Sequence, residues 1–394
     1  MTCETPRNIA VLGSTGSVGK QALEVIGQRG NYFRLKSLTA FNNVRLLAEQ
    51  ARKYRPECVA IGNKDLYTYL RDELSSLPID VYAGEEEIEE VIKYPGTDTV
   101  LHAIVGIAGL KPLVSAIKHK KNVILANKEA MAVAGNLIMA GSGQPGAGII
   151  PADSEHSAVF QCLVGEDSSQ VEKVYLTASG GPFRDKEPVE LKEVGRKDAL
   201  NHPTWDMGKK VSIDSATMMN KGLEVMAARW LFNLEPDQLE VLIHPQSVVH
   251  ALVQFTDGSI KAHMAYPDMK HYLLYALSYP KRAVSDLRRL SFENYPDLGF
   301  KRAVTGGFRC LDLAYMAMKA GGNIPCILNA ANEIAVEAFL NERINFVSIP
   351  EVIERSIDEV GFRKASTIGD IMEYDREARG VSEEIVKTIE AMSR

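Results

Sequence analysis

The first 150 residues alternate regularly between short apolar runs and amphipathic stretches, and this alternation limits the possible folds more than any other feature. We expect strands at residues 8–12, 34–40, 58–62, 80–83, 99–105, 122–126 and 148–151, with helices between them at 20–30, 44–54, 66–77, 85–94, 111–120 and 129–140. Regular β–α alternation with short connections is typical of a mostly parallel sheet covered by helices on both faces. The sequence therefore predicts an α/β fold that begins with a doubly wound parallel sheet.

A glycine-rich turn at residues 13–19 joins the first expected strand to the first helix. Glycines let the backbone approach a pyrophosphate, and the helix N-terminus offers free N–H groups and positive potential. The spacing is G-x-x-G-x-x-G, not the commoner G-x-G-x-x-G, so a glycine turn without a ligand is the alternative. The turn favours a dinucleotide-binding domain.

The end of the second expected strand bears on the choice between NAD and NADP. Dinucleotide folds specific for NAD place an acidic residue there for the ribose 2′-hydroxyl, and residues 40–45 contain none. Arg45 could pair with a 2′-phosphate, or it could only be solvated at the start of the next helix. We favour NADP(H).

Two acidic residues, Asp153 and Glu155, follow the last strand expected in this sheet. If the chain stays extended beyond Pro151, both side chains point to the same side. Such close carboxylates repel each other unless a cation lies between them or one holds a proton. Oxygen ligands without Cys or His at zinc spacing suit Mg²⁺ or Mn²⁺. The alternative is a solvated acidic loop with a helix cap.

Residues 201–210 are typical of a loop, yet they contain His202, Trp205 and Met207. A polar loop seldom keeps a tryptophan exposed without a partner. A lid that closes over a small substrate uses such residues to exclude water. The alternative is that Trp205 packs into a core and His202 has no role.

A helix expected at residues 212–231 carries several polar side chains within an apolar, methionine-rich pattern. Asn220, Lys221 and Glu224 share one face because they are three or four residues apart. Ser215 lies near the expected helix start, where anions bind well. Glu224 could supply a third carboxylate to the cation, whereas a surface Glu–Lys pair is the usual alternative.

The rest of the chain predicts two further regions. Strands expected at 171–178, 249–255 and 259–264, the last two joined by a turn at Asp257 and Gly258, indicate an antiparallel or mixed sheet in an α+β region. Helical patterns at 311–320, 327–341, 350–360 and 382–392 predict a C-terminal helical bundle. We expect a Rossmann-like NADP-binding domain at 1–150, a catalytic metal- and substrate-binding α+β domain at 151–285, a linker at 286–310 and an α-helical domain at 311–394.

Composition excludes several functional classes. The formal net charge of −6 argues against general nucleic-acid binding. The five cysteines are odd in number and lack metal spacing, which suits free thiols in a reducing cytoplasm. No apolar run is long enough to span a bilayer, and we see no signal peptide. We therefore expect a cytoplasmic protein without membrane or nucleic-acid partners.

Six motifs occur together and in one order: GSTGSVG at 13–19, ANKE at 126–129, DSEH at 153–156, TASGGPF at 177–183, HPTWDMG at 202–208 and MMNKGLE at 218–224. In their order and spacing the chain resembles the 1-deoxy-D-xylulose 5-phosphate reductoisomerase family over nearly its whole length. The resemblance implies conversion of this phosphorylated sugar to 2-C-methyl-D-erythritol 4-phosphate in non-mevalonate isoprenoid biosynthesis. The carbon skeleton rearranges first and NADPH then reduces the aldehyde, and the family implies a homodimer.

The resemblance also implies roles for individual residues. The metal ligands, which hold Mg²⁺, Mn²⁺ or Co²⁺, match Asp153, Glu155 and Glu224. The catalytic set adds Lys128 and His202 to these three. The substrate-binding set matches Ser154, Glu155, Ser179, His202, Trp205, Met207, Ser215, Asn220, Lys221 and Glu224. The cofactor contacts match Thr15, Gly16, Ser17, Val18, Asn43, Asn127, Glu129 and Gly208.

One departure and two rival functions remain open. Family members carry Gly-Lys before the residue that matches Asn43, whereas this chain has Phe41 and Asn42, so Arg45 or backbone groups would bind the 2′-phosphate. A thiol-dependent NADP semialdehyde dehydrogenase has a similar nucleotide motif and would need a nucleophilic cysteine, for which Cys162 is the best candidate. A non-enzymatic NADP-binding sensor would bind the cofactor without turnover.

Overall fold

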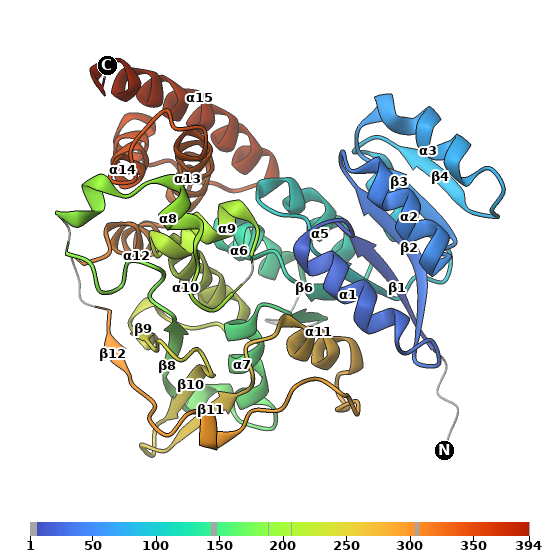
Figure 1. Ribbon diagram of the computed structural model, residues 1–394, viewed down its shortest axis with the longest axis horizontal. Coiled ribbons are helices and arrows are strands. Elements are labelled where there is room, and N and C mark those ends of the chain that lie inside the picture. Colours follow the sequence, from blue (N-terminus) through green and yellow to red (C-terminus); the bar gives the residue numbers. More distant parts are fainter. Residues whose placement is uncertain (1–5, 143–147, 188, 206, 304–306, 394) are drawn as a thin grey trace. The chain divides into compact units, whose positions relative to one another are not determined.

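The computed structural model describes residues 6–142, 148–187, 189–205, 207–303 and 307–393 (Figure 1). It contains two compact units, each assembled from separate stretches of the chain. The first unit comprises Met1–Asn127, Gly141–Ser157 and Asp268–Leu287, and the second comprises Lys128–Ala140, Ala158–Pro267 and Arg288–Arg394. The three domains and the linker expected from the sequence remain a prediction, because both units are assembled from discontinuous stretches.

The first unit is built on a seven-stranded parallel sheet. Its strands are β1 (Arg7–Leu12), β2 (Phe33–Ala40), β3 (Cys58–Ile61), β4 (Asp80–Ala83), β5 (Thr99–His102), β6 (Asn122–Leu125) and β7 (Ile149–Pro151). The strand order β4-β3-β2-β1-β5-β6-β7 reverses direction at β1, and every pair is parallel. This confirms the doubly wound α/β fold, in which ligands bind where the strand order reverses.

The helices of the first unit contribute apolar faces to the core around this sheet. They are α1 (Ser17–Gly27), α2 (Val44–Tyr54), α3 (Tyr67–Leu74), α4 (Glu87–Lys93), α5 (Leu110–Lys118) and α11 (Met269–Ser278). Helix α11 was not expected from the sequence. Asp268 begins it by accepting a hydrogen bond from the Lys270 N–H, and α11 then packs against α1.

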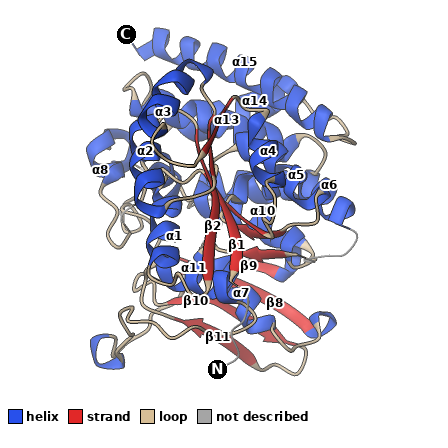
Figure 2. Cartoon of the chain, turned by 90° about the vertical axis from the view of Figure 1, so that its right-hand side faces the viewer, coloured by secondary structure: helices blue, strands red, loops and turns tan. Residues whose placement is uncertain are grey.

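The second unit contains a mixed five-stranded sheet. Its strands are β8 (Val171–Ala178), β9 (Leu239–Ile243), β10 (Val249–Phe255), β11 (Ile260–Met264) and β12 (Lys301–Arg302), in the order β11-β10-β8-β9-β12. Figure 2 shows β8, β10 and β11 side by side. The β10–β11 hairpin turns at Gly258, whose φ of +82° suits glycine, as the sequence predicts. The β8–β9 pair is parallel.

Helices make up most of the remainder. They are α6 (Lys128–Ser142), α7 (Ser154–Leu163), α8 (Arg196–Leu200), α9 (Lys209–Ala216), α10 (Met219–Leu231), α12 (Arg309–Ala320), α13 (Ile324–Leu340), α14 (Ser348–Val360) and α15 (Ile368–Ser393). Short 3₁₀ helices cover Lys64–Leu66, Ile107–Gly109, Ser168–Gln170, Glu190–Glu193, Pro236–Gln238 and Phe292–Asn294. Helix α13 packs against both α14 and α15 (Figure 1), so the expected C-terminal helical region is present.

Two expected helices differ from the observed ones by more than a few residues. The helix expected at 212–231 is two helices, α9 and α10, because Met218 adopts a left-handed conformation with φ 65°. The Thr217 hydroxyl accepts a hydrogen bond from the Met219 N–H at this break. Ser215 therefore lies in the last turn of α9 and not near a helix start. Helix α15 begins at Ile368, well before the expected residue 382.

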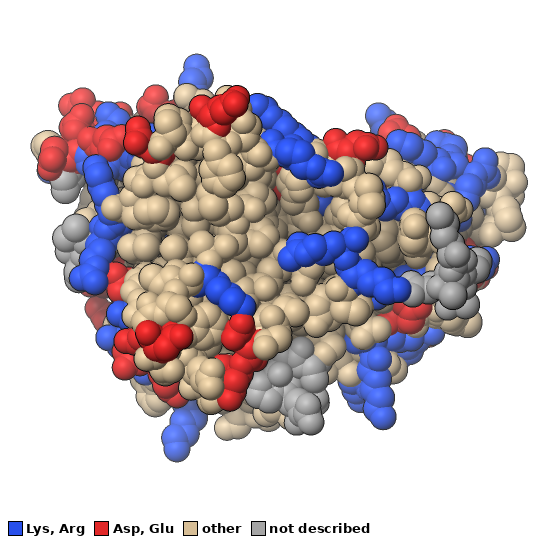
Figure 3. Space-filling model, turned by 90° about the horizontal axis from the view of Figure 1, so that it is seen from below, with Lys and Arg blue, Asp and Glu red and all other residues tan. Residues whose placement is uncertain are grey.

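Three structural features bear on what composition suggests: the surface charges, the helices and the cysteines. Acidic and basic side chains both occur on the face shown in Figure 3, as expected for a small net charge. Among the described residues, no helix combines the length and the apolar character needed to cross a bilayer. Cys58, Cys162, Cys310 and Cys326 are free and buried, and Cys3 lies outside the described residues.

Candidate active site

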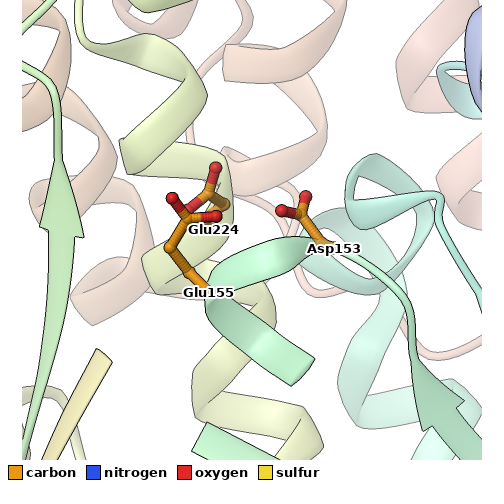
Figure 4. A group of neighbouring side chains, drawn as sticks. All are labelled: Asp153, Glu155 and Glu224. Carbon is orange, nitrogen blue, oxygen red and sulfur yellow. The ribbon is translucent and has the colours of Figure 1, made fainter. Parts of the chain in front are cut away.

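Three carboxylates form a group that could hold a metal ion (Figure 4). Asp153, Glu155 and Glu224 each offer an oxygen, and these oxygens lie within 4.8 Å of one another. Asp153 precedes α7, Glu155 lies in the first turn of α7, and Glu224 lies on α10. Three negative charges at such distances require compensation by cations or protons.

The local geometry of Asp153 and Glu155 differs from the extended one considered from the sequence. The chain leaves β7 at Pro151 and enters α7 at Ser154, so the two side chains do not alternate along a strand. The Ser157 N–H donates to the Asp153 carbonyl at 2.8 Å, which closes the first helical turn. The Ser154 hydroxyl donates to Glu155 Oε2 at 2.5 Å and thereby holds that carboxylate.

Glu224 is surrounded by hydrogen-bond donors. Its side chain is 1% exposed. Asn220 Nδ2 donates to its Oε1 at 2.6 Å, and Lys128 Nζ donates to the same oxygen at 2.9 Å. Lys221 Nζ donates to its Oε2. The shared helix face expected for residues 220, 221 and 224 is therefore present and turned inward, which the surface-pair alternative does not explain. The contact with Lys128 was not foreseen.

Glu129 lies next to Lys128 and takes part in a second buried charge cluster. Lys210 Nζ binds Glu129 Oε1 at 3.0 Å and Asp214 Oδ2 at 2.8 Å, and Asn332 Nδ2 donates to Asp214 Oδ1 at 2.8 Å. Burial alone would raise the pKa of Glu129, but Lys210 and Lys128 outweigh it and lower that pKa. Burial raises the pKa of Asp214, and Lys210 opposes that rise.

Lys210 and Asp214 were missed by the sequence analysis. They are four residues apart, which places them on one face of α9, and this spacing was the available signal. The signal is weak because the same spacing occurs at many exposed ion pairs. Only the fold brings Glu129 and Asn332 to that face, from α6 and α13.

The loop before α9 is held by His202. Its Nδ1 accepts hydrogen bonds from the N–H groups of Trp205 at 2.9 Å and Thr204 at 3.2 Å. Its Nε2 therefore carries the proton and donates to the Ser179 hydroxyl at 3.1 Å. Burial, with a contribution from the Arg184 charge, lowers the pKa of His202 to about 4. The imidazole is neutral at physiological pH.

The two other residues expected in a lid are half-buried. The Trp205 ring lies 6.3 Å from the His250 ring in an edge-on arrangement. Met207 is half-buried in the same loop, and Asp206 lies outside the described residues. Trp205 therefore has an aromatic partner in the second unit without being fully enclosed by it.

The turn after β8 lies against the end of α9. Gly181 has φ +69°, and a Cβ there would lie 2.7 Å from the Ser215 carbonyl oxygen, so only glycine permits this approach. The Gly181 N–H donates to the Ser179 hydroxyl at 3.1 Å. This packing places the Ser179 turn beside Ser215, although Ser215 is far along the chain from it.

The glycine turn of the first unit joins β1 to α1 as expected. Gly13 has φ +77°, and a Cβ there would lie 2.6 Å from the Ala103 carbonyl oxygen. A Cβ on Gly19 would lie 2.3 Å from the Gly13 carbonyl oxygen, so both positions require glycine. Gly16 is the N-cap of α1 without a side-chain hydrogen bond, and Gly16 and Ser17 are exposed. The helix N-terminus is thus open to a ligand.

The remaining residues expected to contact the cofactor lie at helix starts or, in the case of Asn127, in a buried position. Thr15 and Val18 are half-buried beside the exposed N-cap. Asn43 caps α2 by accepting a hydrogen bond from the Leu46 N–H at 3.3 Å. Asn127 is buried and donates through Nδ2 to the Gly106 carbonyl at 2.9 Å. In the second unit, Gly208 is the exposed N-cap of α9.

Cys162 does not have the environment of a nucleophile. It lies on α7 within the apolar core of the second unit, and burial raises the pKa of its thiol to about 11. A reactive cysteine needs a lowered pKa and access to solvent. The structure therefore disfavours the thiol-dependent alternative.

Comparison with known proteins gives one consistent result. Three models of this family match the chain: 1-deoxy-D-xylulose 5-phosphate reductoisomerase at residues 9–135, its C-terminal domain at 149–232, and the DXP reductoisomerase C-terminal domain at 264–381. The 1-deoxy-D-xylulose 5-phosphate reductoisomerase of Bacteroides thetaiotaomicron is 50% identical over 380 residues, which cover 96% of this chain and 97% of the relative.

Solved structures agree over nearly the full length. The reductoisomerase of Zymomonas mobilis in complex with NADPH superposes with a TM-score of 0.90 at 37% identity, covering 97% of this chain and 99% of that one. A DOX-P reductoisomerase in complex with NADPH, fosmidomycin and magnesium gives a TM-score of 0.91 at 36% identity, covering 97% of this chain and 98% of that one. The chain belongs to the 1-deoxy-D-xylulose 5-phosphate reductoisomerase family.

Proposed function

We propose that this chain converts 1-deoxy-D-xylulose 5-phosphate into 2-C-methyl-D-erythritol 4-phosphate, with NADPH as reductant and a divalent cation as cofactor. This is a step of non-mevalonate isoprenoid biosynthesis. Membership of the family supports the reaction, and the group formed by Asp153, Glu155 and Glu224 is the observation that carries its metal dependence. A non-enzymatic sensor has no need for three carboxylates gathered in this way.

The donor set fits a hard divalent ion. Carboxylate oxygens are the ligands preferred by Mg²⁺ and Mn²⁺, and Co²⁺ accepts them as well. When bound, the cation polarises the substrate oxygens and the nicotinamide supplies a hydride. Ser154 fixes the orientation of Glu155, and Asn220 and Lys221 on the same helix hold Glu224.

The chain's own side chains bind and orient the sugar phosphate. Ser179, Ser215, Asn220 and Lys221 form the phosphate-binding set, because they combine neutral donors with one ammonium group near the N-terminus of α10. Lys128 Nζ, already at Glu224, is the cation that orients the substrate oxygens near the metal. Glu155 and Glu224 also face the substrate, with Ser154 beside them.

The loop from His202 to Gly208 is proposed to cover the bound substrate. His202 donates from Nε2 as a neutral imidazole, because its pKa lies far below physiological pH. Trp205 and Met207 supply apolar surface that excludes water from the reaction. Gly208 at the end of this loop joins the cofactor contacts.

NADPH is proposed to bind the glycine turn of the first unit. The exposed N-terminus of α1 offers N–H groups to the pyrophosphate through Thr15, Gly16, Ser17 and Val18. Asn43 and Arg45 lie just beyond β2, where the 2′-phosphate of the ribose binds in this type of fold. Asn127 and Glu129 are also proposed to contact NADPH.

The division of the chain, its assembly and its location belong to the same proposal. The NADP-binding domain at 1–150 precedes the catalytic domain at 151–285, the linker at 286–310 and the helical domain at 311–394. The enzyme acts as a homodimer in the cytoplasm, where its free cysteines remain reduced. It has no nucleic-acid or membrane partner.

The decisive experiment follows NADPH absorbance after 1-deoxy-D-xylulose 5-phosphate is added to the purified chain with Mg²⁺ or Mn²⁺. We expect NADPH to be consumed, consumption to stop in EDTA, and excess Mg²⁺ or Mn²⁺ to restore it. Full activity in the chelator would refute the metal assignment. An absence of turnover under all these conditions would refute the proposed reaction.

A further inference from the structure

Five charged side chains of the second unit form a chain of alternating sign, which we call the alternating-charge chain. In spatial order its members are Glu224, Lys128, Glu129, Lys210 and Asp214. Three of its links are direct ion pairs, with distances of 2.9 Å for Lys128–Glu224, 3.0 Å for Lys210–Glu129 and 2.8 Å for Lys210–Asp214. The remaining link is between Lys128 and Glu129, which are neighbours in the sequence.

The five side chains of the alternating-charge chain are largely buried. Side-chain exposure is 1% for Glu224 and Asp214, 5% for Glu129, 11% for Lys128 and 21% for Lys210. At such burial, a charge that loses its partner finds little water to replace it. Each member therefore depends on its neighbours, and removal of one member favours new pairing among the others.

The Lys128 ammonium interacts with two carboxylates, those of Glu224 and Glu129. Its Nζ donates to Glu224, and its charge also lowers the pKa of Glu129. Lys210 satisfies Glu129 from the other side and is itself held by Asp214, which Asn332 on α13 fixes by a hydrogen bond. While Lys210 is present, Glu129 has a cation of its own.

We infer that Lys210 is a positioning residue for the reaction: by occupying Glu129, it keeps the ammonium of Lys128 at Glu224, where the metal and the substrate bind. The inference rests on the proposed function for the role of Lys128. Lys210 itself touches neither substrate nor metal. It acts through Glu129.

Replacement of Lys210 by methionine tests this arrangement. Glu129 then lacks its cation and attracts Lys128 away from Glu224. Turnover should fall between about 10- and 100-fold, because the substrate loses a positioned cation. Mn²⁺ binding to the chain without NADPH or substrate should instead tighten, by about tenfold, because Lys128 no longer competes for Glu224. A purely structural defect would instead lower turnover and weaken Mn²⁺ binding together.

The double variant Lys210→Met with Glu129→Gln is the matched control. The neutral glutamine has no charge with which to attract Lys128, so the tightened Mn²⁺ affinity should fall back to the wild-type value or below it. Mn²⁺ affinity is measured by the electron paramagnetic resonance signal of free Mn²⁺. An unchanged or weaker Mn²⁺ affinity in Lys210→Met, or no return in the double variant, would overturn the inference.

A second variant keeps the test valid if Lys210→Met does not fold. Glu129→Gln alone removes the competing carboxylate, so Lys128 stays more fully at Glu224 and Mn²⁺ binding should weaken. Tighter or unchanged binding would count against the inference. Because the Mn²⁺ measurements need no substrate, they decide the inference even if the wild-type chain fails to consume NADPH, which would refute the proposed function instead.

Discussion

Glu224 is the residue at which the chemistry of this protein concentrates. It lies on α10 among donors from its own helix and from α6, and it belongs to the group with Asp153 and Glu155. The relation between Glu224, Asn220 and Lys221 could be predicted because helical spacing alone sets it. The contact with Lys128 could not, since only the packed fold brings together residues so distant along the chain.

Replacing Glu224 by glutamine should reduce turnover by two or more powers of ten. The loss corresponds to transition-state stabilisation on the order of 3 kcal/mol, because the neutral amide cannot compensate the charge of the cation. Steady-state NADPH oxidation with saturating Mg²⁺ measures the change. Glu337→Gln, at an exposed position of α13, is the control and should retain wild-type rates. A Glu224→Gln rate within a few-fold of wild type would remove Glu224 from the metal site.

His202 should make the folded protein less stable as the pH falls. Its pKa is about 4 in the folded chain, against 6.5 as the ordinary value, so the unfolded chain binds more protons between these two values. The free energy of unfolding should therefore decrease as the pH is lowered from 6.5 toward 4. His202→Asn should lose less stability over that interval, and urea unfolding of both chains at pH 7.5 and 5.0 measures the difference. Partial exposure of the ring reduces the size of the effect. Equal losses in both chains would contradict the assignment.

At the scale of elements, the helices and strands of the first unit follow the sequence pattern closely. The expected bounds of α2 and β4 coincide with those observed, and in α2 both ends are defined locally, by the Asn43 cap and by the left-handed Arg55. In the second unit the sequence pattern predicted one helix where the structure has two. Residues 212–231 have continuous helical character, and the break between α9 and α10 depends on the left-handed conformation of Met218, which no local signal predicts.

The close packing of α10 against α12 gives a prediction for Gly222. A Cβ at this position would lie 2.5 Å from the Cβ of Ala314, which is fixed to the backbone of α12 and cannot rotate away. Gly222→Ala should therefore lower the free energy of unfolding by roughly 1–3 kcal/mol. Gly380→Ala on α15 meets nothing within 4 Å and should be neutral or stabilising by up to about 1 kcal/mol. Urea unfolding compares the two variants, and an equal effect of both would show that α10 does not pack as described.

At the scale of the whole molecule, the chain passes between the two units several times. Residues 128–140 belong to the second unit and 268–287 to the first, although each segment is flanked along the sequence by residues of the other unit. A reading along the sequence identifies regular alternation and motif order, which were sufficient for the fold class and the family. It could not assign these segments, because the assignment depends on which apolar faces meet after folding.

Titration of the purified chain with Mn²⁺, with bound ion measured per chain, decides whether Asp153, Glu155 and Glu224 together bind one divalent cation. The wild type should bind one ion per chain, and Glu224→Gln should bind it roughly 100-fold more weakly, with no change in Glu337→Gln. Equal affinity in wild type and Glu224→Gln would contradict this shared site.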